Sequence, residues 1–293
     1  MQKSSRKERA IYGIILGLCC AVCIIPIIAV LSISLSSDKA LVMEGYSLLP
    51  RDFTVEAYKY VFQDFARILR AYGVSIFTTV VGTALGLLLN ALMAYVLSRP
   101  NYSLHSKLTV FLTIPMVLSG GLVPTYMLIT KYLNLKDNLL VQILPIAVVP
   151  WYIIMLRTFF SQIPYELSEA AIIDGAGEFR IFWQVVLPLA KPALATVGIF
   201  LALAYWNDWY YPMLYIENSD LVNLQYMLYR MMREVQELTR NAALSGMSMS
   251  AADLPTEAMR MAMCLVAAGP MLVVFPFFQK YFVKGLTVGG VKG

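Results

Sequence analysis

The sequence predicts an all-α membrane protein that crosses the bilayer with six helices. Of its 293 residues, 59% are hydrophobic and 14% are charged, whereas soluble domains hold about 45–50% apolar and about 25% charged residues. Its mean hydropathy is +0.67. The apolar residues also gather in runs of the length that a membrane span needs, about 20 residues. Composition and run length together favour a helical membrane domain over a soluble one.

Six apolar runs define the predicted spans. A helix is expected in each run, because a helix satisfies its own backbone hydrogen bonds where the bilayer offers no water. Asp208, in the fifth run, is the only formal charge in any of them. The predicted spans are Ile11–Leu35, Ala71–Ser98, Leu108–Thr130, Asn138–Leu156, Ala193–Ile216 and Met261–Gln279.

Residues 11–280 are predicted to form one transmembrane domain between an N-terminal tail, 1–10, and a C-terminal tail, 281–293. The first apolar run is longer than that of a signal peptide, so we expect it to be retained as a span. The basic residues of the first tail favour the cytoplasm. Because six spans return the chain to the same side, both termini are predicted to be cytoplasmic.

Several function classes find no support in the sequence. The cysteines all fall inside apolar runs, and the lone His105 has no partners at metal-ligand spacing. The net charge of +5 is spread along the chain, without the basic run of a nucleic-acid arm. No nucleotide-binding motif is present. We therefore predict no catalytic residues, no metal site, no cofactor on this chain and no nucleic-acid partner.

Two segments between the spans have helical periodicity. Thr54–Phe65 and Asn223–Thr239 are each expected to form an amphipathic helix on the outer side of the membrane. Such helices either cap the outer mouth and touch an external partner or lie on the membrane surface. The residues leave both alternatives open.

The loop over residues 161–192 is predicted to contain two short helices with a hinge between them. Pro164 suits the first turn of a helix, and Glu166 and Glu169 lie near its positive end. Gly175 stands where a glycine would end that helix. The loop is thus predicted to be ordered, either as a docking surface or as an ordinary loop helix packed on its own bundle.

The second helix of this loop carries an apolar stripe. The pair Leu187-Pro188 is predicted to break the chain before the fifth span, because proline removes a backbone donor and clashes with the preceding turn. The stripe consists of Phe179, Phe182, Trp183 and Val186.

The loop resembles the EAA-loop signature of ABC importer permeases. Glu169-Ala170-Ala171, Asp174-Gly175-Ala176 and Leu187-Pro188 stand at that signature's spacing. The resemblance implies the type I ABC importer permease fold, with 161–192 as a cytoplasmic coupling loop that docks on an ATPase. The residues that it marks for ATPase coupling are Glu169, Ala170, Ala171, Asp174, Gly175, Phe179, Leu187 and Pro188.

The resemblance also implies a set of partners. They are a second homologous permease subunit, two cytoplasmic ABC ATPase subunits that hold ATP and Mg, and an extracytoplasmic sugar-binding protein. The setting is a bacterial cell membrane, with membrane lipid around the spans. Transport would follow alternating access driven by the ATPase subunits.

Two further segments resemble the maltose-type carbohydrate branch of these permeases. Trp206-Asn207-Asp208, followed by aromatic residues and Pro212, looks like that branch's W-N-D/E motif, and Gln279–Gly293 looks like its C-terminal ending. Within the branch the chain looks most like permeases for oligosaccharides and polysaccharide fragments. Trp209-Tyr210 replaces the frequent Phe-Leu, so the resemblance implies a sugar but not which one.

Polar and aromatic residues in the predicted spans are candidates for a substrate pathway. Polar side chains are costly in lipid and are expected to face the bundle interior, and flat rings suit sugars. Interhelical hydrogen bonds and an interfacial aromatic belt explain the same residues without a substrate. The candidates are Asn90, Gln142, Trp151, Tyr152, Tyr205, Trp206, Asn207 and Asp208.

Two other transporter classes remain as alternatives. An ion-coupled secondary transporter predicts internal repeats and an acidic residue in the middle of a span, and the sequence shows neither. An ABC importer for a non-sugar solute shares the loop but lacks the segment around Trp206.

Overall fold

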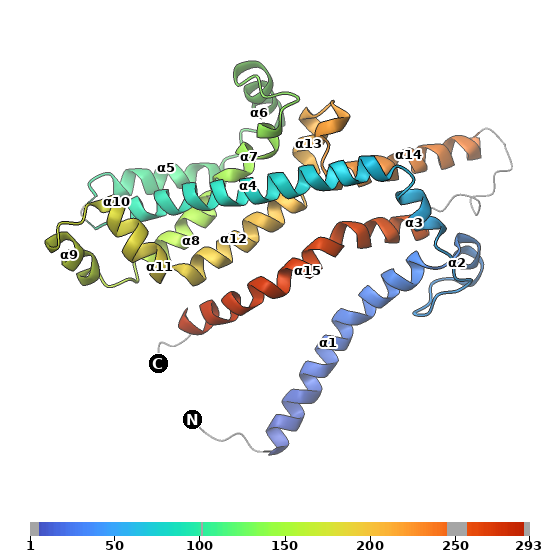
Figure 1. The fold of residues 1–293 in the computed structure, drawn as a ribbon, viewed down its shortest axis with the longest axis horizontal. Coiled ribbons are helices and arrows are strands. Elements are labelled where there is room, and N and C mark those ends of the chain that lie inside the picture. The colour runs from blue at the N-terminus through green and yellow to red at the C-terminus, as the bar shows by residue number, and fades with distance from the viewer. Residues whose placement is uncertain (1–5, 101, 245–256, 290–293) are drawn as a thin grey trace. The chain divides into compact units, whose positions relative to one another are not determined.

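The computed structural model describes residues 6–100, 102–244 and 257–289. These residues are helical throughout, apart from turns and one isolated β-bridge between Ser36 and Phe53 (Figure 1). The predicted all-α fold class is therefore confirmed for the part of the chain that the structure describes. The chain divides into two compact units, Met1–Ile68 with Leu228–Met271 and Leu69–Met227 with Leu272–Gly293.

The first unit contains the N-terminal helices and parts of two late ones. Helix α1, Arg6–Ser34, holds the first predicted span, and its segment Tyr12–Ser34 is long and apolar enough to cross a membrane. Two short helices, an early part of α15 and most of α14 complete the unit. Their bounds are α2 Asp38–Glu44, α3 Glu56–Val61, α14 Leu224–Leu244 and α15 Glu257–Gly289.

Asp38 joins the two ends of this unit's sequence. Its Oδ1 accepts hydrogen bonds from the backbone N–H of Glu257 at 3.0 Å and of Ala258 at 3.4 Å, and the residue is 9% exposed. The first N–H groups of a helix lack partners within the helix and carry its positive end. A carboxylate distant in sequence therefore caps the start of α15.

The second unit is built on a long straight helix. Helix α4, Phe65–Ser98, contains the second predicted span and is the other helix that can cross a membrane by itself. Helices α8, Pro150–Phe160, and α12, Lys191–Trp206, pack together beside it (Figure 1). The core holds fully buried apolar residues from all three helices, among them Ala94, Leu156 and Val197.

The third and fourth predicted spans are broken helices, and a further break lies between the loop 161–192 and the helix of the fifth span. The pairs His105–Val117 with Leu122–Tyr132, Leu139–Ala147 with Pro150–Phe160, and Glu178–Leu189 with Lys191–Trp206 bend by 111°, 48° and 84°. Their separate pieces are α5 His105–Val117, α6 Leu122–Met127, a π segment Leu128–Tyr132, a 3₁₀ turn Leu139–Gln142 and α7 Leu144–Ala147.

The number of spans stays a prediction. By length and composition, the described residues hold two membrane-spanning helices, or up to five if each bent pair is one span. The sixth predicted span, Met261–Gln279, lies in α15, whose side chains are described only to Val273. This helix runs on to Gly289, so much of the predicted C-terminal tail 281–293 is helical, while residues 290–293 lie outside the described part.

Both predicted amphipathic helices form, with different bounds. The first is only α3, Glu56–Val61, shorter than predicted. The second is α14, which begins after Asn223, whose Oδ1 accepts the N–H of Tyr226 at 3.0 Å as an N-terminal cap. Leu224, Met227, Leu228 and Val235 on its predicted apolar face are buried, and Met231 is half-buried.

Candidate functional site

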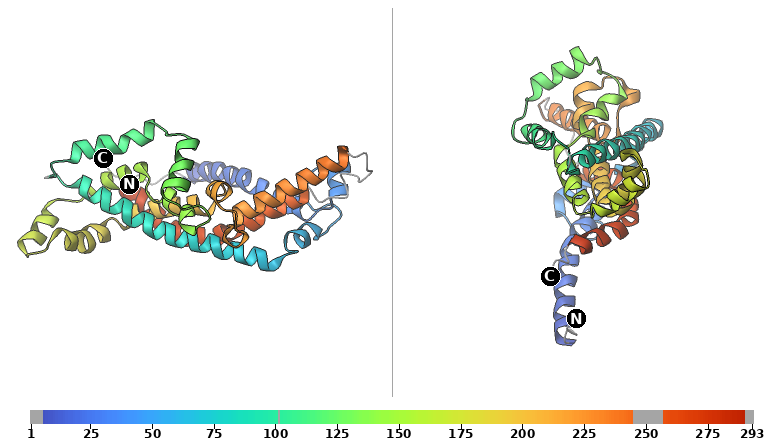
Figure 2. Two further views of the ribbon diagram at one scale, coloured as in Figure 1. Left: turned by 90° about the horizontal axis from the view of Figure 1, so that it is seen from above. Right: turned by 90° about the vertical axis from the view of Figure 1, so that its left-hand side faces the viewer.

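The predicted coupling loop forms a compact helical element at the end of α4 (Figure 2, left). Its first helix is α9, Glu166–Ile173. Its second part consists of α10, Glu178–Ile181, a π segment, Phe182–Val186, and α11, Leu187–Leu189. The predicted arrangement of two helical parts with a hinge is confirmed.

Gly175 ends α9 as predicted. The N–H of Gly175 donates to the carbonyl of Ile172 and that of Ala176 to the carbonyl of Ala171, each at 2.9 Å. Gly175 itself has a φ of +78°. This pair of bonds around a left-handed residue is the Schellman ending of a helix, which glycine adopts without the steric cost of a Cβ.

Pro188 does not break the chain where the sequence predicted. The helical run continues through α11 to Leu189, and the bend of 84° comes before Lys191. The preceding turn is a π turn, in which the N–H of Leu187 donates to the carbonyl of Phe182. Because this wider turn already departs from the α pattern, the ring of Pro188 fits at the start of α11 instead of ending the helix.

The second part of the loop is anchored by its apolar side chains. Ile181, Phe182 and Val186 are at most 4% exposed in the core, and the ring of Phe182 meets Tyr95 of α4 edge-on at 5.1 Å between centroids. The predicted stripe divides between two faces, because Phe179 and its edge-on neighbour Trp183 are exposed. Only Phe182 and Val186 of the stripe therefore face the core.

The outer face of the loop combines exposed apolar and acidic side chains. Ile173 is 85% exposed and Phe179 is 73% exposed, and Glu169 and Asp174 lie on the surface with them. Large apolar groups exposed together are unusual on a soluble surface and mark contact with a partner. Among the residues marked for coupling, Ala170 and Pro188 are also exposed, whereas Ala171 and Leu187 pack partly against the core.

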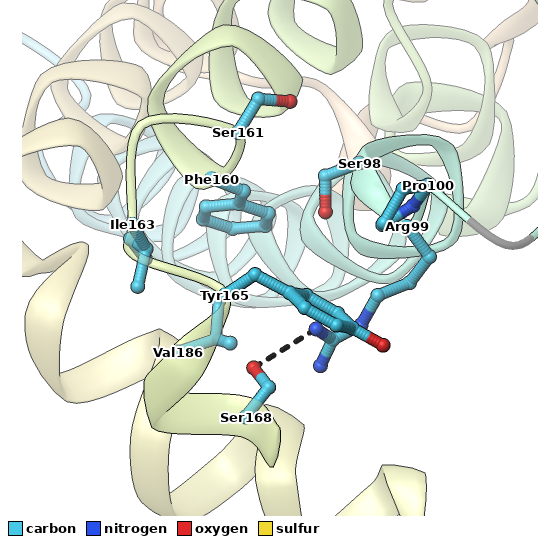
Figure 3. A pocket seen from close by; sticks show the side chains of 9 residues that line it. All are labelled: Ser98, Arg99, Pro100, Phe160, Ser161, Ile163, Tyr165, Ser168 and Val186. Atoms are coloured by element: carbon cyan, nitrogen blue, oxygen red, sulfur yellow. Dashed lines mark hydrogen bonds between the residues drawn. The ribbon is translucent and has the colours of Figure 1, made fainter.

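A polar cluster that the sequence analysis missed ties this loop to α4. Arg99, directly after α4, donates from Nη1 to Ser168 Oγ at 3.0 Å (Figure 3) and from Nη2 to the Tyr95 hydroxyl. Its Nε lies 3.3 Å from the Glu178 carboxylate, which also accepts from Tyr95. Nothing in the sequence pairs the end of a span with residues of a distant loop, so no local pattern could have revealed this cluster.

A cavity of about 250 Å³ lies beside Arg99 (Figure 3). It separates the start of the loop from the ends of α4 and α8. Its lining residues are Ser98, Arg99, Pro100, Phe160, Ser161, Ile163, Tyr165, Ser168 and Val186.

Asn90, a candidate for the substrate pathway, makes hydrogen bonds to the backbone at a broken span. Its Nδ2 donates to the carbonyls of Gly86 at 2.6 Å and Ala147 at 2.7 Å, and its Oδ1 accepts the N–H of Val149 at 3.1 Å. The last two groups flank the break between α7 and α8. Because Asn90 is fully buried and both its amide hydrogens are used, its side chain replaces bonds that the broken helix has lost.

Tyr205 and Gln142 also bond to backbone. The Tyr205 hydroxyl donates to the carbonyl of Ile143, and Gln142 Nε2 donates to the carbonyl of Leu221, each at 2.8 Å. Both residues are 1% exposed, and Gln142 Oε1 has no partner among the described residues. The Tyr205 ring lies so close to α4 that a Cβ at Gly82 would meet it at 2.5 Å.

Trp206, Asn207 and Asp208 lie at and beyond the end of α12. Trp206 is buried, with its ring 6.4 Å from that of Tyr72, while Asn207 is exposed and bonds back to Leu203. Asp208 is 9% exposed. Its Oδ1 accepts the N–H groups of Tyr210 and Tyr211, at the start of helix α13, Tyr210–Tyr215, so it caps that helix.

The remaining candidates are more open. Trp151 is 61% exposed, and Tyr152 is half-buried with its ring stacked on Phe200 at 6.2 Å. The structure therefore brings Asn90 and Tyr205 together at the broken fourth span and leaves Trp151 and Asn207 on the surface. No group of metal-ligating side chains occurs among the described residues.

Known proteins resemble this chain over most of its length. It is 40% identical to Protein LplC of Bacillus subtilis, over 93% of this chain and 90% of that protein. It is 36% identical to the polygalacturonan/rhamnogalacturonan transport system permease protein YtcP of the same organism, over 98% of each. A crystal structure of a bacterial ABC transporter involved in alginate import matches with a TM-score of 0.77 and 30% identity, covering 96% of this chain and 100% of the other.

A family match agrees with these likenesses. Residues 82–288 match the family described as binding-protein-dependent transport system inner membrane component, and that range includes the whole coupling loop. The alginate-transporter match confirms the permease fold that the loop motif implied. The chain therefore belongs to the family of binding-protein-dependent transport system inner membrane components.

Proposed function

We propose that this chain is one transmembrane subunit of an ATP-driven ABC importer that carries an oligosaccharide or polysaccharide fragment across the cell membrane. The observation that carries the proposal is the loop between α8 and α12. Its inner side is buried against α4, and its outer side presents Ile173, Phe179 and two carboxylates. An ordered element with a fixed inner face and an apolar outer face suits the transfer of movement from a docked partner.

The chain itself acts by moving rather than by chemistry. No nucleotide motif is present in the sequence, so ATP and Mg would be bound by partner subunits and this chain would need no cofactor. When those subunits close on ATP, the loop would shift with them and rock the attached helices between outward-open and inward-open states. Broken helices that line a path are a recurring way to build such a moving bundle.

The assembly that fits this action contains four kinds of partner surface. The coupling loop would meet one of two cytoplasmic ABC ATPase subunits, and the exposed apolar helices would meet a second, homologous permease subunit and membrane lipid. An extracytoplasmic sugar-binding protein would deliver the substrate. This arrangement requires the loop and both termini on the cytoplasmic side of a bacterial membrane, which the basic N-terminal tail favours.

The sugar class is supported by the relatives. Besides the two relatives above, an arabinooligosaccharides transport system permease protein of Bacillus subtilis is 27% identical over 92% of this chain. The substrates named for YtcP, for the arabinooligosaccharides permease and for the alginate importer are all oligomers or polymers of sugars. Fragments of such polysaccharides are therefore the proposed cargo of this chain.

Co-purification tests the proposal. The tagged chain, extracted from native membrane in mild detergent, is expected to bring a second permease and an ATPase with it. ATP hydrolysis by that complex should rise when a binding protein loaded with oligogalacturonides, alginate oligomers or arabino-oligosaccharides is added. Recovery of the chain without any ATPase, under conditions that keep membrane complexes intact, would overturn the importer reading.

A further inference from the structure

Helix α9 is held to the bundle chiefly through polar contacts. Ser168 is its one buried residue, at 2% exposure, and the side chains on either side of it are exposed. The neighbouring part of the loop, in contrast, sinks three apolar side chains into the core. The helix that carries the Glu169-Ala170-Ala171 motif therefore has little apolar packing of its own.

Arg99 supplies the missing attachment. Its guanidinium group donates to Ser168 of α9 (Figure 3), lies beside the carboxylate of Glu178 in α10 and donates to Tyr95 of α4. One side chain thus contacts both helical parts of the loop and the end of the long helix. Because an arginine donates in several fixed directions at once, it can hold three elements in one geometry, which lysine cannot.

The two side chains of the ion pair between Arg99 and Glu178 differ in burial. The Arg99 side chain is 15% exposed, whereas that of Glu178 is 63% exposed. A cation held mostly out of water keeps its partners strongly, while a carboxylate near the surface can be reached by a docking protein. The cavity beside Arg99 leaves space between the start of the loop and the bundle, so the loop is not locked there by close packing.

From these contacts we infer that movement of α9 is transmitted to α4 through Arg99, which Tyr95 and Glu178 hold in position. The inference rests on the coupling function proposed above and names the residues through which it acts. Arg99 is a positioning residue here, since it acts through Ser168, Glu178 and Tyr95. Without it, α9 would still dock on a partner but would shift without moving α4.

The decisive variants are Arg99→Met, Arg99→Lys and Glu178→Gln in the complete importer. Arg99→Met should lower uptake per ATP hydrolysed by about fivefold to tenfold, while the complex still assembles and hydrolyses ATP. Glu178→Gln should have a smaller effect in the same direction. Arg99→Lys should recover part of the loss, because it restores the charge without the fork of donors.

Arg157→Met is the matched control. Arg157 is also half-buried, but its Nη1 donates to Thr109 of α5 at 3.4 Å and not to the loop. Its replacement should leave uptake per ATP within about twofold of the wild type. An equal loss in Arg157→Met and Arg99→Met would contradict this role of Arg99, because replacing any half-buried arginine would then lower uptake per ATP.

Hydrogen exchange separates this inference from the importer proposal. In the purified full-length chain, Arg99→Met should speed exchange of the α9 amides by about tenfold and leave those of α12 unchanged. If Arg99→Met shows wild-type exchange in α9 and wild-type uptake per ATP, the inferred role of Arg99 is wrong. A wild-type chain that binds no ATPase would overturn the importer proposal, while faster exchange in Arg99→Met would still support the attachment of α9 by Arg99. Loss of assembly in all three variants would overturn the coupling role and make the cluster a requirement for folding.

Discussion

The coupling loop and the broken fourth span use polar residues in opposite ways. In the loop, Glu169 and Asp174 lie on the surface beside exposed apolar side chains. At the fourth span, Asn90 of α4 and Tyr205 of α12 are buried, and both donate to carbonyls near the break between α7 and α8. Glu169 and Asp174 are available to a partner, whereas Asn90 and Tyr205 use their hydrogen bonds within the fold. Hydrogen bonds within the fold are therefore enough to explain why Asn90 and Tyr205 are buried.

The largest expected effect is on the free energy of unfolding, and it tests the hydrogen bonds that Asn90 makes at the broken fourth span. Asn90→Leu should lower the free energy of unfolding by about 2–4 kcal/mol, because it leaves the carbonyl of Ala147 and the N–H of Val149 buried without partners. Thermal unfolding of the purified chain in detergent would show the loss. Asn90→Asp should be destabilising as well, because the carboxyl group keeps an acceptor for Val149 but lacks the amide hydrogens that Gly86 and Ala147 accept. Unchanged stability in Asn90→Leu would mean that the residue is free to serve a substrate.

The next effect tests the close approach of α4 and α12. A Cβ at Gly82 would meet the Tyr205 ring at 2.5 Å, so Gly82→Ala should cost about 1–3 kcal/mol through overpacking. Gly73→Ala, in the same helix and with open space around it, is the control and should be neutral or slightly stabilising. Equal stability of the two variants would show that the ring moves aside without cost.

Features that depend on neighbouring residues could be predicted from the sequence, whereas contacts between distant residues could not. The apolar runs and the glycine that ends α9 are local signals, so the helical fold and the hinge at Gly175 could be predicted. The partners of Asn90 and Arg99 lie 57 and 69 residues away, at Ala147 and Ser168. No periodicity encodes such contacts. The position of the bend after Leu189 was missed because a π turn changes what Pro188 does.

A smaller effect on stability is expected in the loop. Gly175→Ala should cost about 1 kcal/mol, because an added Cβ has open space but must adopt a φ of +78°. Gly177→Ala is the matched control, since its φ of −76° suits any residue. Uptake per ATP should fall in Gly175→Ala and not in Gly177→Ala. Similar uptake in both would remove the helix ending from the coupling mechanism.

The smallest effect on folding should accompany a clear effect on assembly. Phe179 is 73% exposed, so Phe179→Ala should change the free energy of unfolding by less than about 0.5 kcal/mol. If its ring enters a partner's pocket, binding of the ATPase should weaken by more than about 1 kcal/mol. Titration of detergent-solubilised chain with purified ATPase measures the difference. Unchanged binding would place the docking surface elsewhere on the loop.

The most direct test of coupling through the loop is uptake measured together with ATP hydrolysis in vesicles that contain the whole importer with Gly175→Asp. We expect this variant to insert, assemble and hydrolyse ATP, because the glycine has open space around it. Uptake of the sugar should be lost, because α9 can no longer end in the wild-type geometry. Wild-type uptake by Gly175→Asp would contradict the account, since the loop would then not carry the movement.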